Sequence, residues 1–339
     1  MKKTAVVILN WNGKRFLEKF LPGVLENSRD TATVIVADNA SDDGSLEFMA
    51  THYPEVRVIR NDRNYGFAEG YNRALARVEA KYYVLLNSDI EVTPGWIAPV
   101  VECMEKDDRI AACQPKVLSY HNKKHFEYAG ASGGFIDKYG YPFCRGRLFL
   151  ALEEDRGQYD TERDIFWATG ACLFVRADLY REHGGLDGDF FAHMEEIDFC
   201  WRMKNLGYRI RVCPSSTVYH VGGGTLPKSS ARKTYLNFRN NMSLLYKNLP
   251  SHRLIKVFVA RFFLDIIASG KFLLEGHFSD FIAVIRAYIS FYGSAGKHRK
   301  KRKALDQKKA TEIYRGNIAL EYFIRRKKRF TQLNPGKFS

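Results

Sequence analysis

The chain has 339 residues, of which 45% are hydrophobic and 27% charged, which is enough for one large domain with an appendage or for two domains. The net charge of +15 is uneven, because residues 251–339 carry 20 Lys+Arg against 6 Asp+Glu, while residues 1–250 are nearly neutral. This composition argues against long disordered segments, and no run of 18 uncharged apolar residues is present to span a bilayer.

The first 120 residues alternate between strand-like and helix-like segments. Strand-like runs cover residues 5–9, 33–37, 56–60, 82–87 and 110–118, and helix-like runs cover residues 14–27, 44–52, 67–80 and 95–106. This alternation predicts an α/β fold with a mostly parallel central sheet flanked by helices.

The pattern is less regular further along the chain. Residues 119–165 are rich in Gly, Tyr and Phe and predict loops and short antiparallel strands. Residues 170–176 and 208–213 predict strands, with helices beginning near Ala177 and from Glu195 to the terminating Gly207. After Pro250, apolar residues at helical spacing predict two amphipathic helices, at 254–266 and 281–292, followed by the basic runs 297–303 and 325–329. We therefore expect a domain over 1–250 and a helical basic extension over 251–339.

Four polar segments directly follow successive predicted strands. They are Asn10-Trp11-Asn12, the loop from Asp38 to Ser45, the segment from Asn64 through Gly66 to Asn72, and Asn87-Ser88-Asp89. Ligands of open α/β sheets bind at the carboxyl ends of the strands, so we expect these segments to form one site.

Each of these segments also has a plainer interpretation. Asn, Ser and Asp are ordinary turn formers, and Ser41 or Asp43 could simply cap the next helix. Alternatively, Asp89 could hold a hard divalent cation that carries a diphosphate. The glycines after Asn64 would allow close approach of a ligand, and the following helix N-terminus favours phosphate.

The segment after residue 190 places three carboxylates, Glu195, Glu196 and Asp198, within four positions. Repulsion between them raises at least one pKa, which suits a general base. The competing interpretation is that they complement the helix dipole and that Asp198 pairs with Arg202 at the i+4 position. His220, at the end of a strand-like run and before glycines, is a candidate metal ligand or a structural hydrogen-bonding residue.

Taken together, these segments resemble glycosyltransferase family 2, the inverting nucleotide-sugar transferases with a GT-A fold, and most closely its bacterial rhamnosyltransferase-like branch. The segments that carry the resemblance lie between residues 4 and 225 and are VVILNWN, VADNASDDGS, NYGFAEGYN, LLNSDIEV, GACLFVR, FFAHMEEIDFCWR and VYHVGGG.

The resemblance implies a role for several residues. Asp38 and the Asn10–Asn12 loop would hold the nucleoside, and Asp89 with His220 would bind manganese or magnesium and the donor diphosphate. Glu196 would deprotonate the acceptor hydroxyl. Asn87 replaces the first Asp of the family's metal-binding motif, which removes one charge there. Glu196 replaces the Asp that is usually the base, so Glu195 or Asp198 could be the base instead.

The resemblance implies transfer of a sugar from a nucleoside diphosphate to a glycan or a polyprenyl-diphosphate-linked acceptor in surface polysaccharide assembly. The alternatives are a sugar-1-phosphate nucleotidyltransferase and an inactive membrane-associated adaptor with this fold. A sugar-1-phosphate nucleotidyltransferase usually has a Gly-rich basic loop after its first strand. This chain has Asn-Trp-Asn-Gly there, which argues against that alternative.

The sequence also indicates where the protein acts. No signal peptide is expected, because Asn10-Trp11-Asn12-Gly13 interrupts the first apolar run, and six cysteines without a CxxC pair are typical of reduced core thiols in the cytoplasm. The amphipathic helices and basic runs predict association with the anionic inner face of the cytoplasmic membrane; alternatively they pack on the first domain. Nucleic-acid binding is not expected, because the basic runs lack interleaved aromatic residues.

Overall fold

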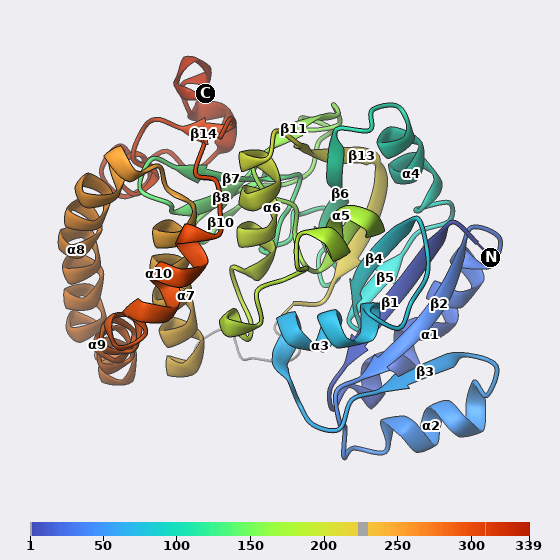
Figure 1. The fold of residues 1–339 in the computed structure, drawn as a ribbon. Coiled ribbons are helices and arrows are strands. Elements are labelled where there is room, and N and C mark those ends of the chain that lie inside the picture. The colour runs from blue at the N-terminus through green and yellow to red at the C-terminus, as the bar shows by residue number, and fades with distance from the viewer. Residues whose placement is uncertain (1, 223–229, 309) are drawn as a thin grey trace.

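The computed structural model describes residues 2–222, 230–308 and 310–339. A nine-stranded sheet forms the centre, with strand order β11-β13-β6-β12-β4-β1-β2-β3 and with β5 paired to β13 (Figure 1). The strands of this sheet are β1 (Thr4–Asn10), β2 (Ala32–Asp38), β3 (Arg57–Arg60), β4 (Tyr82–Asn87), β5 (Ile90–Val92), β6 (Ile110–Ser119), β11 (Arg163–Ile165), β12 (Cys172–Arg176) and β13 (Arg209–His220).

Four neighbouring strands run parallel: β1 pairs with β2 and β4, and β2 pairs with β3. The four polar loops follow these strands and therefore leave the sheet at the same edge, as the sequence predicted. Beyond β4 the sheet is mixed, because β12 runs antiparallel to both β4 and β6.

Helices cover both faces of the sheet, which explains why the strands are apolar at nearly every position. Along β1, Val6 and Ile8 pack on one face with residues of α1, α2 and α4, whereas Ala5 and Val7 pack on the other with α3, α5 and α6. The bounds of these helices are α1 (Lys14–Ser28), α2 (Ser45–His52), α3 (Gly66–Leu75), α4 (Ala98–Glu105), α5 (Ala177–Glu182) and α6 (Glu195–Asn205). All six cysteines are buried and unpaired, in agreement with the prediction of core thiols.

A smaller sheet of five strands, in the order β10-β9-β8-β7-β14, stands beside the central one. Its strands are β7 (Gly134–Asp137), β8 (Pro142–Cys144), β9 (Arg147–Leu148), β10 (Ala151–Leu152) and β14 (Ile313–Tyr314). The antiparallel pairing of β7 to β10 agrees with the sequence prediction for this region. The end of the chain was predicted only as a basic extension, yet β14 pairs with β7, and Phe330 and Phe338 stack against Phe135.

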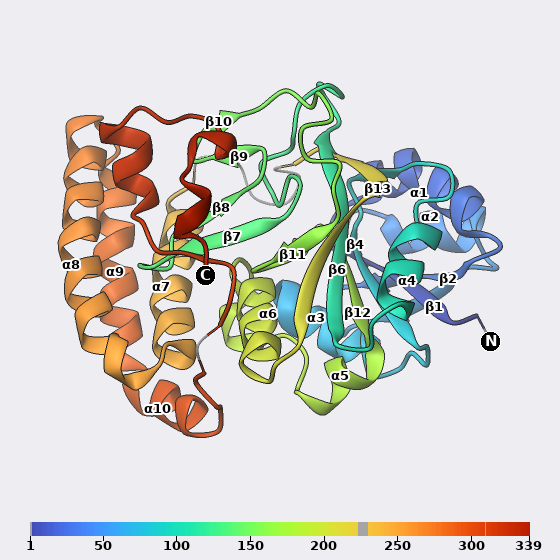
Figure 2. The same ribbon diagram turned by 90° about the horizontal axis from the view of Figure 1, so that it is seen from above.

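Four helices form a separate layer on one side of the molecule (Figures 1 and 2). They are α7 (Ala231–Asn248), α8 (Ser251–Leu274), α9 (Phe278–Gly293) and α10 (Ala295–Lys303). The sequence predicted α8 and α9 but not α7, and it treated the basic residues of α10 as a charge run. No helix among the described residues has the length and hydropathy needed to cross a bilayer.

Two of the element boundaries that differ from the prediction change how the chain reaches the central sheet and the site. The helix expected over 67–80 ends at Leu75, because Val78 turns into the core and Lys81 already bonds the carbonyl of Lys3 beside β1. The strand expected over 208–213 continues to His220, after an irregularity beyond Cys213. That continuation delivers His220 to the edge where the polar loops gather.

Candidate active site

The first two loops are joined by buried hydrogen bonds. Asp38, at the end of β2, accepts hydrogen bonds from Asn10 Nδ2 at 3.0 Å and from Ser41 Oγ at 2.6 Å. Asn12 and Ala40 adopt left-handed backbone conformations, with φ of 51° and 61°. Left-handed non-glycine residues are strained and gather at functional sites, so the two loops have the character of a binding surface.

Trp11 and Ser88 complete this part of the edge. The Trp11 ring is 40% exposed, so its face is available for stacking on a planar group. A side chain on Gly13 would meet Asn10 Oδ1 at 2.5 Å and Ser88 Oγ at 3.3 Å. The loop after β4 therefore lies directly against the loop after β1.

The third loop has a different role from the one the sequence suggested. Asn39 Nδ2 donates to Asn64 Oδ1 at 3.1 Å and to the Gly66 carbonyl at 2.9 Å. Gly66 is needed because a Cβ there would lie 2.7 Å from the carbonyl oxygen of Phe191. That same oxygen accepts a hydrogen bond from the Phe67 amide at 2.7 Å, so this helix N-terminus is closed by protein and does not offer a free phosphate site.

Asn72, the last residue predicted in the third loop, is also engaged with protein. Its amide nitrogen donates to the Leu186 carbonyl at 2.6 Å, and its oxygen accepts from Tyr180 Oη at 2.7 Å and from the Leu186 amide. Asn72 thus fastens α3 to the segment that leads into α6.

Asp89 and His220 lie together, as predicted. Asp89 Oδ1 is 3.2 Å from His220 Nε2, since β5 pairs with the end of β13 and places Ile90 opposite His220. Asn87 Nδ2 is 3.5 Å from the same ring nitrogen. On the other side of the ring, Nδ1 is 3.1 Å from Glu127 Oε2. Gly223 and Gly224, which follow His220 in the sequence motif, lie outside the described residues.

The two carboxylates control the charge of His220. Burial alone would lower the pKa of His220, but Asp89 and Glu127 raise it to about 10. No sequence pattern indicates Glu127, because it lies in the irregular region between β6 and β7 at no recognisable spacing from the other groups. Its position behind the ring is that of a carboxylate that orients a metal-bound histidine.

The donor set fits a divalent cation. Asp89 Oδ1 and His220 Nε2 lie 3.2 Å apart, which is close enough for both to bind one cation, and the Asn87 amide lies beside them. Ser88 lies between Asn87 and Asp89 in the chain. Carboxylate and amide oxygens suit manganese and magnesium, and an imidazole nitrogen suits transition metals. A cation bound at His220 Nε2 would replace the proton on that nitrogen, and the proton on Nδ1 would be donated in a hydrogen bond to Glu127.

Glu196 has the surroundings expected of a general base. It is partly buried near the start of α6, and its Oε2 has no hydrogen-bond partner among the described residues. Burial raises the pKa of Glu196 to about 7. Glu196 Cβ is 3.8 Å from the place of a Cβ on Gly170, and the neighbouring Ala171 carbonyl accepts from the Asn87 amide at 3.0 Å. Through this segment, Glu196 is tied to the Asp89 loop.

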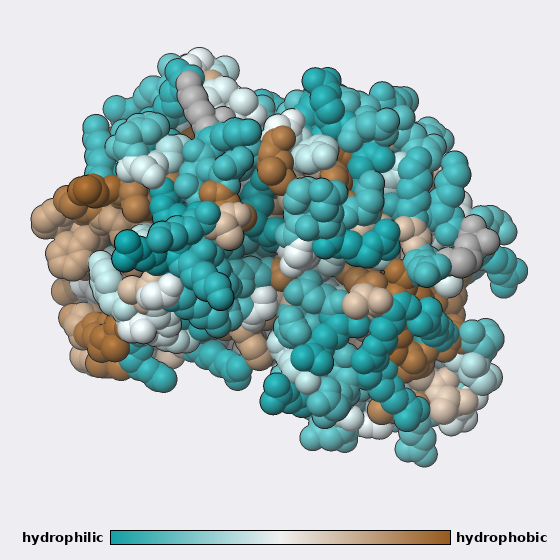
Figure 3. All heavy atoms as spheres, in the orientation of Figure 1, coloured by the Kyte–Doolittle hydropathy of each residue, from teal (hydrophilic) through white to brown (hydrophobic). Residues whose placement is uncertain are grey.

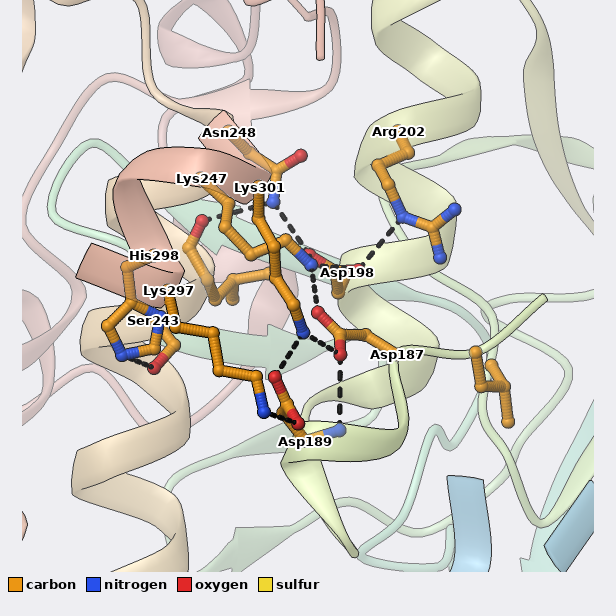
Figure 4. A network of polar contacts seen from close by, with 12 residues as sticks. Asp187, Asp189, Asp198, Arg202, Ser243, Lys247, Asn248, Lys297, His298 and Lys301 are labelled. Atoms are coloured by element: carbon orange, nitrogen blue, oxygen red, sulfur yellow. Dashed lines mark hydrogen bonds and ion pairs between the residues drawn. The ribbon is translucent and has the colours of Figure 1, made fainter. Parts of the chain in front are cut away.

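The other two carboxylates have different environments. Burial and the charge of Glu196 raise the pKa of Glu195 well above its usual value. Asp198 is completely buried and contacts Arg202 at 2.9 Å, Lys247 at 2.8 Å and Asn248 at 2.9 Å (Figure 4). Burial alone would raise the pKa of Asp198, but Lys247 and Arg202 hold it below its usual value. The i+4 pair that the sequence offered as the alternative for Asp198 is therefore present.

The segment before α6 is held in a strained conformation by α7. Phe191, His193 and Met194 all have φ between 64° and 73°. Asn240 of α7 donates to the carbonyls of Phe190, Ala192 and His193 at 2.8 to 3.0 Å. The sequence did not predict α7 and so missed Asn240, although this side chain fixes the turn that presents Glu196.

The buried cation beside Asp198 is expected to support the fold. Replacing Lys247 by methionine would leave Asp187 and Asp198 buried without it, and we expect a loss of about 3–5 kcal/mol in the free energy of unfolding. Lys271→Met removes a lysine of an exposed pair with Glu275 and should cost less than about 1 kcal/mol. Urea denaturation of both variants checks this; equal midpoints would contradict it.

Comparison with known proteins identifies the family of the chain. Residues 5–184, more than half of the chain, match the sequence profile described as "Glycosyl transferase family 2". The chain therefore belongs to glycosyl transferase family 2 and is a glycosyltransferase. It is 25% identical over 230 residues to an N-acetylglucosaminyl-diphospho-decaprenol L-rhamnosyltransferase of Mycobacterium tuberculosis, covering 63% of this chain and 75% of the relative.

Solved structures show the same GT-A fold. GalNAc-T7, crystallised with UDP, GalNAc and Mn²⁺, superposes with a TM-score of 0.57 at 16% identity; the match covers 75% of this chain but only 49% of that one. The mannosyltransferase PcManGT from Pyrobaculum calidifontis, solved with GDP-Man and Mn²⁺, gives 0.50 at 15% identity, covering 87% and 75% of the two chains.

Proposed function

We propose that this protein is an inverting glycosyltransferase that moves a sugar from a nucleoside-diphosphate donor to a glycan or lipid-linked acceptor in surface polysaccharide assembly. The observation that supports the proposal most is the contact of Asp89 Oδ1 with His220 Nε2 at 3.2 Å, in a loop that meets the loop after β1 at Gly13 and Ser88 and that contacts the Gly170–Ala171 segment beside Glu196. These groups come from five separate parts of the chain, and their chemistry matches the needs of a metal-bridged diphosphate next to a base.

The proposed reaction is a single displacement. Glu196 takes the proton of the acceptor hydroxyl, whose oxygen attacks the anomeric carbon on the face opposite the diphosphate. The bond from that carbon to the diphosphate breaks, so the product has the inverted anomeric configuration. A cation held by Asp89 and His220 would offset the charge of the departing nucleoside diphosphate.

The remaining site residues would bind the donor. Asp38 and Asn10 would orient the nucleoside, Trp11 would cover its base, and Asn12 and Ser88 would line its path. Asn64, Gly66 and Asn72 would shape the site indirectly, because their hydrogen bonds and close contacts run to Asn39, Phe191 and Leu186. We assign Asp198 to holding α6 and keep Glu195 as the second candidate for the base.

The relatives suggest the class of donor and acceptor. The Mycobacterium tuberculosis relative is named for transfer of L-rhamnose to a sugar diphosphate linked to decaprenol. We propose a related reaction here, with a polyprenyl-diphosphate-linked glycan as the acceptor and the inner face of the cytoplasmic membrane as the place of action. Nucleic acid has no part in this proposal.

Donor turnover tests the proposed function. Purified protein should release nucleoside diphosphate from one member of a panel of dTDP-, UDP- and GDP-sugars in the presence of manganese, and chelation should stop the release. Formation of nucleotide sugar from a sugar 1-phosphate and a nucleoside triphosphate would indicate a nucleotidyltransferase. Absence of both reactions, with acceptor lipid extracts supplied, would favour the inactive adaptor.

A further inference from the structure

From Arg261 onward, helix α8 is polar on the side that faces the protein and apolar on the side that faces outward, whereas earlier in the helix Val257 is buried and Phe258 packs against the core. The buried positions on its inner face include Arg261, Asp265 and Ser269, at intervals of four residues. The large outward-facing side chains are all apolar from Val259 to Ile267, and they are Val259, Phe262, Phe263, Ile266 and Ile267. A helix on a water-exposed surface shows the opposite arrangement.

The polar inner face is fully engaged, so this orientation of the helix is specific. Arg261 and Asp265 form an ion pair at 3.1 Å. Tyr141 and Tyr288 donate hydrogen bonds to the two oxygens of Asp265 at 3.1 and 2.8 Å. Turning α8 to hide its apolar face would break these buried contacts and leave charges unpaired, at a large cost in free energy.

Helix α9 extends the apolar surface. Its exposed large side chains recur every three or four residues and are Phe278, Ile282, Ile285, Ile289 and Tyr292. Figure 3 shows hydrophobic residues along the left edge of the molecule, where α8 and α9 lie, and a further hydrophobic area on the right-hand side. Ten large apolar side chains exposed on two neighbouring helices exceed the singly scattered ones that are normal on a surface, so they mark an interaction site.

The charges around this surface identify the partner. Exposed cations lie on α8, α9 and α10, namely Lys256, Arg286, Arg299 and Lys300, while the exposed Lys271 and Lys297 are paired with Glu275 and Asp189. The exposed acid of α8's end, Glu275, is already paired with Lys271 at 2.7 Å. A second copy would bring a cationic rim against a cationic rim, whereas an anionic lipid surface complements both the charge and the apolar side chains.

We propose that α8 and α9 lie in the interface of an anionic lipid bilayer, with the apolar residues defined above inserted among the acyl chains and the cations at the headgroups. This surface, here called the docking surface, deepens the proposed function, because it names the part of the chain that meets the membrane carrying the acceptor.

The docking surface is rigidly connected to the proposed base. Lys297 and Lys301 of α10, which follows α9, contact Asp189 and Asp187 before α6 (Figure 4). Lys247 of α7 contacts Asp198 within α6. The bilayer would thus hold Glu196 at a fixed height, which suits an acceptor whose diphosphate is anchored at the same surface.

Vesicle sedimentation tests the docking surface. Full-length protein should co-sediment with vesicles of phosphatidylglycerol and phosphatidylcholine and bind phosphatidylcholine vesicles much more weakly. Phe263→Ser/Ile267→Ser should reduce the partition coefficient at least about tenfold, because two side chains lose their burial in the apolar phase. The control Leu150→Ser/Leu206→Ser changes two exposed apolar residues outside the docking surface and should bind as wild type.

Three results would overturn the proposal: equal vesicle binding by both double variants, equal binding to neutral and anionic vesicles, or a dimer in sedimentation velocity that Phe263→Ser/Ile267→Ser dissociates. Release of nucleoside diphosphate without vesicles separates this proposal from the enzymatic one. If the protein binds vesicles but releases no nucleoside diphosphate, the docking surface is retained and the enzyme function is rejected. If Phe263→Ser/Ile267→Ser still releases nucleoside diphosphate while its vesicle binding falls, both the docking surface and the enzyme function are supported.

Discussion

Asp89→Ala is expected to lower turnover of the donor by about a thousandfold, because the cation and the diphosphate would lose the carboxylate that holds them and several kcal/mol of transition-state stabilisation with it. Asp89 is buried, and its charged contact among the described residues is with His220, at 3.2 Å, so none of them supplies a second carboxylate in its place. Initial rates of nucleoside diphosphate release, measured over a range of manganese concentrations, check this expectation.

A matched substitution separates this effect from a general loss of carboxylate. Asp30→Ala removes an exposed aspartate in the turn between α1 and β2, at the opposite end of β2 from Asp38, and should leave the rate unchanged. If Asp89→Ala retained the wild-type rate at every manganese concentration, the assignment of Asp89 as the ligand of the cation and diphosphate would be wrong.

Glu196→Gln should lower turnover by about 10²- to 10⁴-fold, because the amide cannot accept the proton of the acceptor hydroxyl. Donor binding should persist, because the nucleotide-binding loops lie on other elements. Glu182→Gln, at an exposed position on α5, is the matched control and should keep full activity.

The pH dependence of turnover is an independent test of Glu196 as the base. Burial raises the pKa of Glu196 to about 7, and only the ionised carboxylate can act as the base. The rate should therefore rise with pH up to and through about 7, and then level. If Glu195 were the base, the pH–rate profile of Glu195→Gln would differ from that of wild type. If Glu196→Gln kept the wild-type rate and Glu195→Gln were inactive, Glu195 would be the base.

The sheet and its polar edge could be predicted because the information is local. Apolar runs followed at once by Asn10, Asp38 and Asn87 specify both the buried strands and the loops at their carboxyl ends, and Asn64 follows the shorter β3 after three polar residues. The pairing of β1 with β2 and β4 then brings those loops together, without any long-range information beyond the parallel order of the strands.

Other parts of the site depend on contacts that no local pattern records. Glu127 reaches His220 from an irregular segment, and Asn240 reaches the turn before α6 from a helix whose polar residues show no simple periodicity. Gly66 was read as making room for a ligand, but it makes room for Phe191, a residue 125 positions away. The sequence pattern favoured Glu196 as the base and left Glu195 and Asp198 as alternatives; burial and the nearby Lys247 and Arg202 distinguish Asp198 from Glu196.

Calorimetric titration with nucleoside diphosphate, with and without manganese, tests the central claim most directly. Wild type and Glu196→Gln should both bind the diphosphate more tightly with manganese, since the cation and the base are held by separate groups. Asp89→Ala should lose the manganese dependence. Manganese-dependent binding that persisted in Asp89→Ala and His220→Ala would contradict the proposed metal and diphosphate site.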